Sequence, residues 1–297
     1  MSVKSSFYPI LLSIDLEYWF ESPSIERYLS GQEKESLTLY CDQLLSLLSA
    51  KRATATFFVT GKVIKQEPEL IKKLHLAGHE IAVHSFDHQP LWHKTAQQFT
   101  LDLKEMIAQI QFLTSTRPIG HRAANFSLDQ QTNWALKILT ANDIKYDSSI
   151  FPYHFSPWLF KAYQGSLYGL ASKNFIPYRI NLNYPNQVDK NSALLEFPTS
   201  IFHWSFFKLP LTGGIYIRLI PWTIFKFLLK TKLKKEVASI HFHPFDFLTN
   251  PPQLLMPQLK KFIKYYNTKN TWKKLNYLLD NYHCLSFKQY LHENTLD

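Results

Sequence analysis

The chain has 297 residues, with 33 Lys and Arg against 23 Asp and Glu, which gives a formal net charge of +10. Apolar residues make up 45% of the chain, which excludes a disordered or fibrous protein, and the length suits one large α/β domain or two small ones. Aromatic residues reach 15%, and together with the positive charge they suggest nucleic acid, an anionic membrane surface or carbohydrate as the partner.

Short apolar runs alternate with amphipathic segments along the first half of the chain. The strand segments are 10–14, 53–59, 80–83, 118–122 and 144–147. The helical segments between them are 37–48, 68–77, 95–113 and 130–140. This regular alternation is typical of βα units around a parallel sheet.

The second half is less regular. Residues 151–184 are aromatic and contain proline, which indicates a long loop or a β-insert. Further strands are expected at 194–198 and 237–242, and basic amphipathic helices at 251–266 and 272–282. Because the sequence has no internal repeat and no clear linker, we expect a single domain over residues 1–297.

Neither the termini nor the cysteines indicate export. The first residues lack the apolar core of a secretory signal, and no stretch reaches the roughly 20 apolar residues of a spanning helix. Cys41 and Cys284 match no metal-binding spacing, so we expect two buried thiols in a reducing, cytoplasmic setting.

Polar side chains gather where the predicted strands end, which is where active sites lie in parallel α/β folds. Asp15 and Glu17 follow the first strand and point to the same face, so a cation or a shared proton is expected between them. The alternative is one loop carboxylate and one helix cap. His84 and His88 follow the third strand, at a spacing that can place both imidazoles on one side of a helical turn.

Three further clusters follow later strands. Arg122 could hold a carboxylate in bidentate fashion, although a surface arginine is the simpler interpretation. Asp147 could orient a histidine or cap a turn. His241 and His243 share one strand face. One of them could be a general acid, or both could be histidines at the edge of the core.

These clusters, in this order along nearly the whole chain, resemble the polysaccharide deacetylase family of carbohydrate esterases. SIDLEYW resembles the family's acidic motif, HSFDH its metal motif, GHRAANFS its arginine motif, YDSSIFP its fourth motif and IHFHPFD its final histidine motif. Glu196–Pro198 and Gly213–Arg218 resemble the branch of the family that is associated with exopolysaccharide and surface-glycan gene clusters. The resemblance implies an α/β fold, a distorted (β/α) barrel of about seven strands.

The resemblance also implies roles for single residues. Glu17, His84 and His88 would be ligands of a divalent metal, most often Zn2+ in this family. Asp15 would be the catalytic base and Arg122 its tether. His243 would be the general acid, preferred over His241 because a proline follows it, and Asp147 would orient it.

The sequence departs from the family pattern at two positions. Glu17 stands where the family usually has aspartate, and Ala124 stands where a proline usually follows the arginine. The first departure leaves open whether Glu17 or Asp15 is the carboxylate ligand. The second suggests a different wall of the substrate groove.

The implied activity is metal-dependent hydrolysis of the N-acetyl amide of an N-acetylhexosamine, in a surface glycan or its lipid-linked precursor. Two other classes stay open: a metal-independent amide hydrolase of the same fold acting on a small molecule, and an inactive carbohydrate-binding module. Nucleic acid is not expected as a partner.

Positive charge is concentrated in the last third of the chain. Lysines follow the apolar stretch 215–229 and cover the two helices predicted at 251–266 and 272–282. One hypothesis is peripheral contact with the inner face of the cytoplasmic membrane, where a lipid-linked saccharide would be met. The alternative is a solvated basic face.

Overall fold

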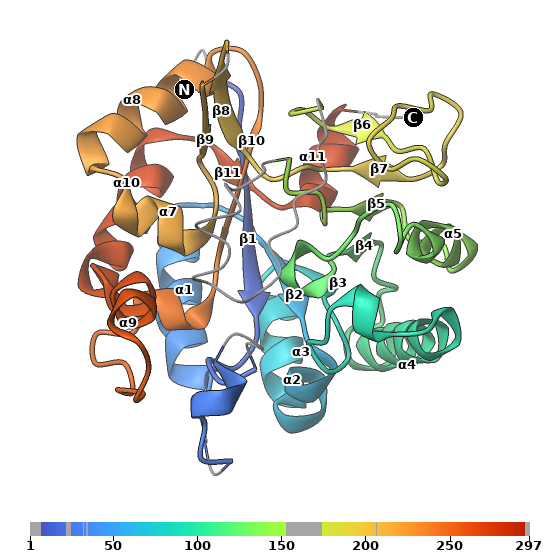
Figure 1. Ribbon diagram of the computed structural model, residues 1–297, viewed down its shortest axis with the longest axis horizontal. Coiled ribbons are helices and arrows are strands. Elements are labelled where there is room, and N and C mark those ends of the chain that lie inside the picture. Colours follow the sequence, from blue (N-terminus) through green and yellow to red (C-terminus); the bar gives the residue numbers. More distant parts are fainter. Residues whose placement is uncertain are drawn as a thin grey trace.

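A curled sheet of nine strands with helices around it is the frame of the molecule (Figure 1). This computed structural model describes residues 7–21, 25–31, 33, 35–152, 174–205 and 207–294. The strands of the sheet are β1 (Ile10–Leu16), β2 (Thr56–Val59), β3 (Glu80–Val83), β4 (Gly120–His121), β5 (Tyr146–Asp147), β6 (Tyr178–Arg179), β7 (Leu195–Glu196), β10 (Ala238–Phe242) and β11 (Cys284–Leu285). Their order is β10-β1-β2-β3-β4-β5-β7-β6, with β11 paired to β1.

The pairing is parallel from β10 to β7, and only β6 runs antiparallel to its neighbour β7. Seven parallel strands therefore line up along this path, as expected for a distorted (β/α) barrel. Two hydrogen bonds between Ser200 and Ser239, at 3.4 and 2.6 Å, join the chain beyond β7 to β10 and bring the two sides of the curl together. Because β10 and β11 pair with β1, the sheet joins both ends of the chain, and we keep the prediction of one domain over residues 1–297.

Helices cover the outside of the sheet, and a separate hairpin lies beside it. The helices are α1 (Thr38–Ala50), α2 (Gly61–Gln66), α3 (Pro68–Leu76), α4 (Ala96–Thr114), α5 (Trp134–Ala141), α7 (Gly213–Leu219), α8 (Trp222–Leu233), α9 (Gln258–Tyr265), α10 (Thr271–Asn281) and α11 (Phe287–Asn294). The hairpin consists of β8 (Ile201–Trp204) and β9 (Phe207–Pro210).

The alternation of side chains along β1 explains why polar residues face the inside of the curl. Ile10, Leu12 and Ile14 belong to the large apolar cluster between sheet and helices. Leu11, on the opposite face, belongs to a smaller cluster that includes Phe58, Tyr146, Phe197 and Phe287. Because side chains alternate along a strand, Ser13 and Asp15 share the inner face with Leu11.

Two predicted helices begin later than the sequence suggested. The helix predicted from residue 251 begins at Gln258, because Pro251, Pro252 and Pro257 lack the N–H groups that helix continuation needs. The helix predicted from residue 130 begins at Trp134, because the Asp129 carboxylate accepts the N–H groups of residues 131 and 132 in a turn.

Three further predictions concern the irregular segment, the cysteines and membrane-spanning helices. Most of the irregular segment predicted at 151–184 lies outside the described residues, and its last part contains β6. Cys41 and Cys284 are unpaired and buried, as expected. Within the described part of the chain, no helix combines the length and the apolar character that crossing a bilayer requires.

Candidate active site

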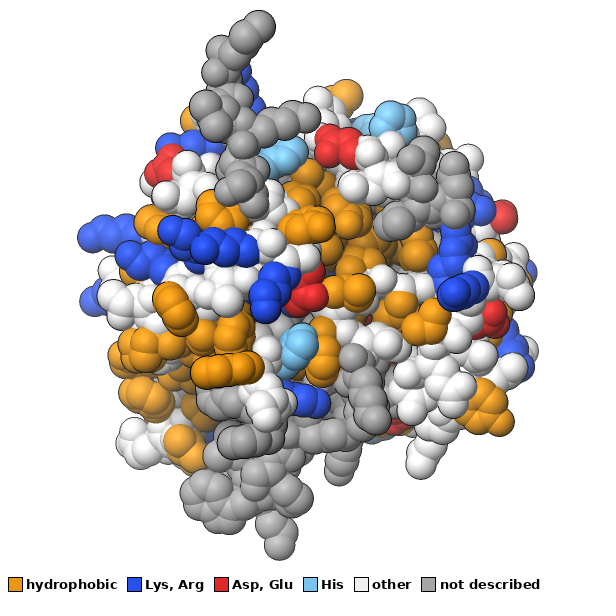
Figure 2. Space-filling model, turned by 90° about the horizontal axis from the view of Figure 1, so that it is seen from above, with side chains coloured by type: hydrophobic (Ala, Val, Ile, Leu, Met, Phe, Trp, Pro, Cys, Tyr) orange, Lys and Arg blue, Asp and Glu red, His pale blue; other side chains and the backbone are white. Residues whose placement is uncertain are grey.

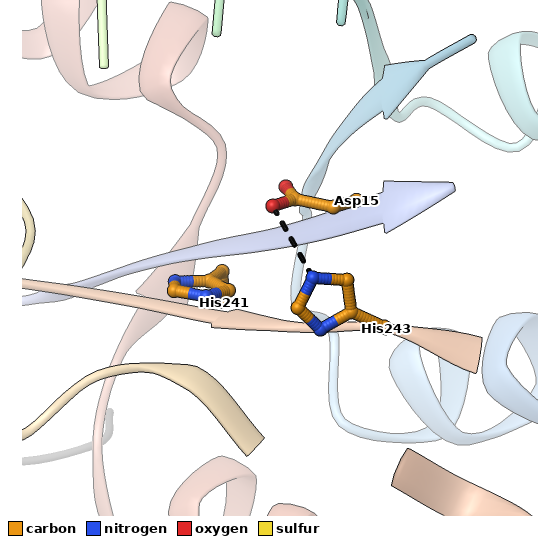
Figure 3. A group of neighbouring side chains, drawn as sticks. All are labelled: Asp15, His241 and His243. Atoms are coloured by element: carbon orange, nitrogen blue, oxygen red, sulfur yellow. Dashed lines mark ion pairs between the residues drawn. The ribbon is translucent and has the colours of Figure 1, made fainter. Parts of the chain in front are cut away.

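The carboxyl ends of β1, β3, β4 and β10 bring most of the predicted site residues together on the inner side of the sheet. Glu17, His84 and His88 form one group, in which one ligand atom from each residue lies within 4.8 Å of the others. Asp15, His241 and His243 form a second group under the same criterion (Figure 3). Of the predicted residues, Arg122 and Asp147 belong to neither group, although Arg122 forms an ion pair with Asp15.

The first group is arranged around one carboxylate oxygen. Glu17 Oε2 lies 2.5 Å from His88 Nε2 and 3.6 Å from His84 Nε2, and the three side chains are at most 4% exposed. The segment 84–88 forms an irregular turn rather than the helical turn expected from the spacing. In this turn His88 adopts the left-handed conformation, with φ of 55°, which a non-glycine residue seldom takes without a local reason.

Backbone carbonyls fix the orientation of both imidazoles. His84 Nδ1 lies 2.8 Å from the carbonyl oxygen of Arg122, and His88 Nδ1 lies 3.0 Å from that of Glu21. A carbonyl only accepts hydrogen bonds, so each Nδ1 carries the proton and donates it. In the neutral ring Nε2 then keeps its lone pair and points toward Glu17, which is the tautomer a metal ligand needs.

The electrostatics of the group favour a cation. Burial alone would raise the pKa of Glu17, but His88 and His84 beside it hold that pKa well below its usual value. Burial alone would lower the pKa of His88, whereas the Glu17 carboxylate raises it to about 9. Glu17 Oε2 is buried and makes no hydrogen bond. Two imidazole nitrogens and one carboxylate oxygen without a hydrogen bond fit a divalent ion such as Zn2+.

Arg122 fixes Asp15 from behind. Its Nη1 donates to Ser13 Oγ at 2.9 Å and makes a close ion pair with Asp15 Oδ1. The guanidinium also donates to the Ser148 carbonyl and hydroxyl at 3.1 and 2.9 Å, and it lies 4.1 Å from the centre of the Phe58 ring. Burial would raise the pKa of Asp15, but Arg122 and the nearby histidines lower it to about 2.

His243 faces the other oxygen of Asp15. Its Nε2 lies 3.8 Å from Asp15 Oδ2 (Figure 3). The His243 side chain is 22% exposed, whereas that of Asp15 is 3% exposed. Asp15 therefore has one oxygen held by a fixed cation and the other directed toward a partly open imidazole.

The expected partnership between Asp147 and His243 is wrong. His243 Nδ1 instead lies 3.3 Å from Asp246 Oδ2, which also accepts the backbone N–H of His243 at 3.0 Å. Asp147 Oδ1 lies 2.7 Å from His121 Nδ1 and accepts the hydroxyl of Ser149 at 2.8 Å. The reason is chain geometry: Asp147 ends β5, whereas Asp246 lies in the turn that directly follows His243.

Asp147 supports the site indirectly, through the loop that holds Arg122. It accepts the N–H and the hydroxyl of Ser149, whose own hydroxyl accepts the N–H of Ala123 at 2.8 Å. Next to it, the hydroxyl and carbonyl of Ser148 hold the guanidinium of Arg122. We therefore assign Asp147 to the shape of the loop around Arg122.

Asp246 is itself fixed by residues far away in the sequence. Its Oδ1 lies 3.1 Å from Arg218 Nη2 and accepts the Nε–H of Arg218 at 3.2 Å. Burial would raise the pKa of Asp246, but Arg218 and His243 lower it. Space for the carboxylate exists because residue 214 is glycine: a Cβ there would lie 2.0 Å from the carboxyl carbon of Asp246.

The charge on Asp246 in turn acts on His243. Burial would lower the pKa of His243, but its hydrogen bond to Asp246 and the nearby carboxylates raise that pKa above the ordinary value. His241 behaves in the opposite way, since burial lowers its pKa to about 3. The hydroxyl of Thr212, 2.9 Å from His241 Nδ1, holds that ring in the wall of the site.

The two groups differ in how well they suit a metal. In the second group, the guanidinium of Arg122 already neutralises Asp15 and repels a second cation. In the first group, no arginine or lysine forms a described ion pair with Glu17, and its oxygen is directed at both imidazoles. The geometry therefore favours Glu17 rather than Asp15 as the carboxylate ligand.

The residues to which the sequence assigned no individual role are those that hold the predicted site residues in place. They are Ser13, Ser148, Gly214, Arg218 and Asp246. A signal existed for Asp246, because an acid three residues after His243 is well placed to reach back to that histidine at the start of a short turn. No sequence signal connects Arg218 to it.

Two family models match separate parts of the chain. The model described as polysaccharide deacetylase matches residues 33–144, and a domain of unknown function, DUF3473, matches residues 166–292.

Among curated relatives, the peptidoglycan deacetylase of Helicobacter pylori is 25% identical over 81% of this chain and 82% of its own length. The peptidoglycan-N-acetylmuramic acid deacetylase PdaA of Bacillus subtilis is 40% identical, but the match spans only 25% of this chain and 28% of that protein. A chitooligosaccharide deacetylase of Sinorhizobium fredii is 38% identical over 18% of this chain and 25% of its own length.

Solved structures support the fold. A putative polysaccharide deacetylase from Mycobacterium smegmatis has a TM-score of 0.56 at 16% identity, covering 99% of this chain and 92% of its own. A CE4 family pseudoenzyme from Bacillus anthracis has a TM-score of 0.51 at 12% identity, covering 95% of this chain and 65% of its own. Since the second of these is described as a pseudoenzyme, the fold by itself does not establish turnover, and the residues of the site carry that argument.

Proposed function

Because the chain belongs to the polysaccharide deacetylase family, we propose that it hydrolyses the N-acetyl amide of an N-acetylhexosamine with the help of a divalent metal ion. We place the sugar in a surface glycan or its lipid-linked precursor. The observation that carries the proposal is the convergence of a Glu17–His84–His88 group and an Asp15–His243 pair at one end of the sheet.

Glu17, His84 and His88 would hold the metal ion through Oε2 and the two Nε2 atoms. When bound there, a divalent ion such as Zn2+ makes a water molecule more acidic and polarises the amide carbonyl. The protein contributes the orientation: the carbonyls of Arg122 and Glu21 hold both rings so that their lone pairs face the carboxylate.

Asp15 would accept a proton from the attacking water. With a pKa near 2 it is ionised at neutral pH but is a weak base, so it suits a water molecule that is already acidified. Arg122 holds its Oδ1, which leaves Oδ2 as the oxygen that accepts the proton. The fixed ion pair also prevents the carboxylate from turning away from the reacting water.

His243 would give a proton to the departing sugar amine. Its Nδ1–H is engaged with Asp246, so the proton available for transfer is on Nε2. The raised pKa of His243 keeps a larger share of the imidazole protonated at neutral pH, as a general acid requires. The Arg122 guanidinium thus lowers the pKa of the base, Asp15, and the Asp246 carboxylate raises the pKa of the acid, His243.

The test is acetate release from N-acetylated oligosaccharides by the purified protein, with and without added Zn2+. We expect turnover with metal, loss of turnover after chelation, and recovery when metal is restored. Asp15→Asn should reduce turnover by roughly 10²–10⁴-fold while the variant still binds glycan. An exposed substitution of the same kind, Asp143→Asn, is the control and should leave turnover unchanged.

Other results would support the alternatives. Turnover that persists in metal-free protein would indicate a metal-independent amide hydrolase. A wild-type protein that binds glycan but releases no acetate from any acetylated amino sugar would indicate a carbohydrate-binding module. Either result overturns the proposal.

A further inference from the structure

One continuous stretch of the chain has basic residues but no acidic ones. Residues 197–235 contain no Asp and no Glu, and they include the β8–β9 hairpin, α7 and α8. Two of the basic residues serve the interior, because Arg218 pairs with Asp246 and Lys232 pairs with Glu236 at 2.5 Å. The lysines that remain have no described ion pair and give this part of the surface an uncompensated positive charge.

The helix α8 has a buried face and an exposed face. Phe225, Leu228, Leu229 and Leu233 pack into the core. Ile224 and Phe227 lie on the other face and are 49% and 68% exposed. Exposed Lys230 and Lys234 continue the same line at spacings of three and four residues. Exposed apolar side chains also occur on other helices, such as Phe112 on α4, so α8 is distinguished by an exposed apolar pair that lies next to lysines without a described ion pair.

The β8–β9 hairpin extends this face. Trp204, at its tip, is 77% exposed. Lys208 on β9 is also exposed, but it pairs with His203 and therefore lies on the other face of the hairpin. Lys232 Nζ donates to the carbonyl of Ile201 at 3.4 Å, which joins α8 to the base of the hairpin. In Figure 1 the hairpin and the carboxyl end of α8 lie side by side at one end of the molecule. We call the exposed residues Trp204, Ile224, Phe227, Lys230 and Lys234 the α8 surface.

We propose that the α8 surface binds the surface of a bilayer that contains anionic lipids. Viewed onto that end of the molecule, Figure 2 shows Lys and Arg side chains gathered on the side where α8 lies, with hydrophobic side chains beside them. Lysines attract anionic headgroups, while tryptophan and phenylalanine insert at the boundary between headgroups and acyl chains. Exposed Ile224 argues against nucleic acid, because an aliphatic side chain gains from contact with acyl chains but does not stack on bases.

The position of the α8 surface also bears on the substrate, an extension that rests on the proposed function. In Figure 1, β1 runs away from the end where the hairpin projects, so its carboxyl end, which carries Asp15 and leads to Glu17, lies near the middle of the molecule. A bound molecule would therefore hold its candidate active site away from the bilayer. This favours a glycan that extends from the membrane over a short saccharide attached directly to a lipid.

The test is cosedimentation of the full-length protein with vesicles at about physiological salt, where exposed charges more than roughly 8 Å apart are screened. We expect binding to phosphatidylcholine vesicles that contain phosphatidylglycerol, and none to pure phosphatidylcholine. Lys230→Glu combined with Lys234→Glu should weaken binding by at least about tenfold, since each lysine near an anionic surface contributes about 1 kcal/mol. Lys104→Glu combined with Lys137→Glu, exposed on α4 and α5, changes the net charge equally and should not weaken it.

A second measurement does not depend on charge reversal. Vesicles with brominated acyl chains should quench part of the tryptophan emission, and Trp204→Phe should remove that quenching without disturbing the fold. The proposal is wrong if anionic vesicles do not bind, if both double variants bind equally, or if duplex DNA competes vesicles off at the same salt. Acetate release from a soluble oligosaccharide, measured in parallel, should be the same for wild type and the Lys230→Glu/Lys234→Glu variant, so loss of vesicle binding is separable from loss of activity.

Discussion

Asp246 accepts two hydrogen bonds from His243, one from the backbone N–H at 3.0 Å and one from imidazole Nδ1 at 3.3 Å. The same carboxylate is held on its other side by Arg218, 3.1 Å away. Arg218, in α7, thus fixes the charged Asp246, and Asp246 in turn orients His243, which follows β10. His243 is directed at Asp15 because of this three-residue arrangement.

Asp246→Asn is expected to lower kcat by about tenfold or more, because part of the contribution of a general acid depends on its pKa. Asparagine keeps an acceptor for the backbone N–H but removes the negative charge. The pKa of His243, raised in the native protein mainly through its bond to Asp246, should fall. The protonated form is then lost at lower pH, so the alkaline limb of the kcat profile should shift downward in pH.

Asp147→Asn provides the contrast for this prediction. If Asp147 only shapes the loop around Arg122, this variant can lose activity, but the alkaline limb of its profile should stay in place. A profile that shifts in Asp147→Asn and not in Asp246→Asn would restore the partnership first expected from the sequence. Asp143→Asn, an exposed change of the same kind, controls for the loss of one negative charge.

The sequence was sufficient for features that depend on neighbours along the chain. Strand periodicity and position at strand ends predicted that Asp15, Glu17 and His84 would converge, because parallel strands bring their carboxyl ends together. The identity of the residue that orients His243 depends instead on tertiary packing. Nothing near Gly214 or Arg218 in the sequence indicates that they make room for Asp246 and hold it.

The same distinction applies to the rest of the fold. The start of α9 could have been predicted from the prolines that precede it, Pro251, Pro252 and Pro257, since each removes a backbone donor. The β8–β9 hairpin could not, because Ile201–Trp204 lacks the apolar–polar alternation of a half-buried strand. Exposure of Trp204 likewise follows only from where the hairpin projects.

Gly214→Ala is expected to act on catalysis through Asp246. The added Cβ would lie 2.0 Å from the carboxyl carbon and must displace a group that Arg218 and His243 hold. We expect a loss of about 1–3 kcal/mol in the free energy of unfolding and a fall in kcat like that of Asp246→Asn. Thermal unfolding and acetate release measure the two effects.

Gly78→Ala is the matched control for that variant. Its φ of +87° penalises a side chain, but nothing lies within 4 Å of the added Cβ. It should lower stability by roughly 1–2 kcal/mol and leave kcat unchanged. If both glycine variants lose activity equally, the effect is general destabilisation and not displacement of Asp246.

Metal content should separate the two carboxylates that the sequence left as alternatives. Glu17→Gln removes the charge at the centre of the histidine pair and should weaken Zn2+ binding at least about tenfold. Asp15→Asn should retain the metal, because Arg122 and not the ion is its partner. Isothermal titration of the metal-free proteins with Zn2+ tests this directly. Loss of metal in Asp15→Asn with retention in Glu17→Gln would move the metal site to the Asp15–His241–His243 group.

Glu196→Gln is expected to stabilise the protein at neutral pH. Glu196 is fully buried, and burial together with the neighbouring Asp147 raises its pKa well above 4.5, the value expected when the chain is unfolded. Between those two pKa values the folded state binds a proton that the unfolded state has released, so stability falls as pH rises. Glutamine keeps the acceptor for the N–H of Ile150, 2.9 Å away in the native protein, and has no proton to lose.

The gain in the free energy of unfolding from Glu196→Gln should therefore grow with pH above about 4.5. The growth should be up to about 1.4 kcal/mol for each pH unit, until the pH reaches the pKa of Glu196 in the folded protein. Urea unfolding of both proteins at a series of pH values measures the difference. Glu69→Gln, an exposed change of the same kind, should show no such growth because water already solvates its charge. A constant difference across the series would mean that Glu196 is ionised in the folded protein.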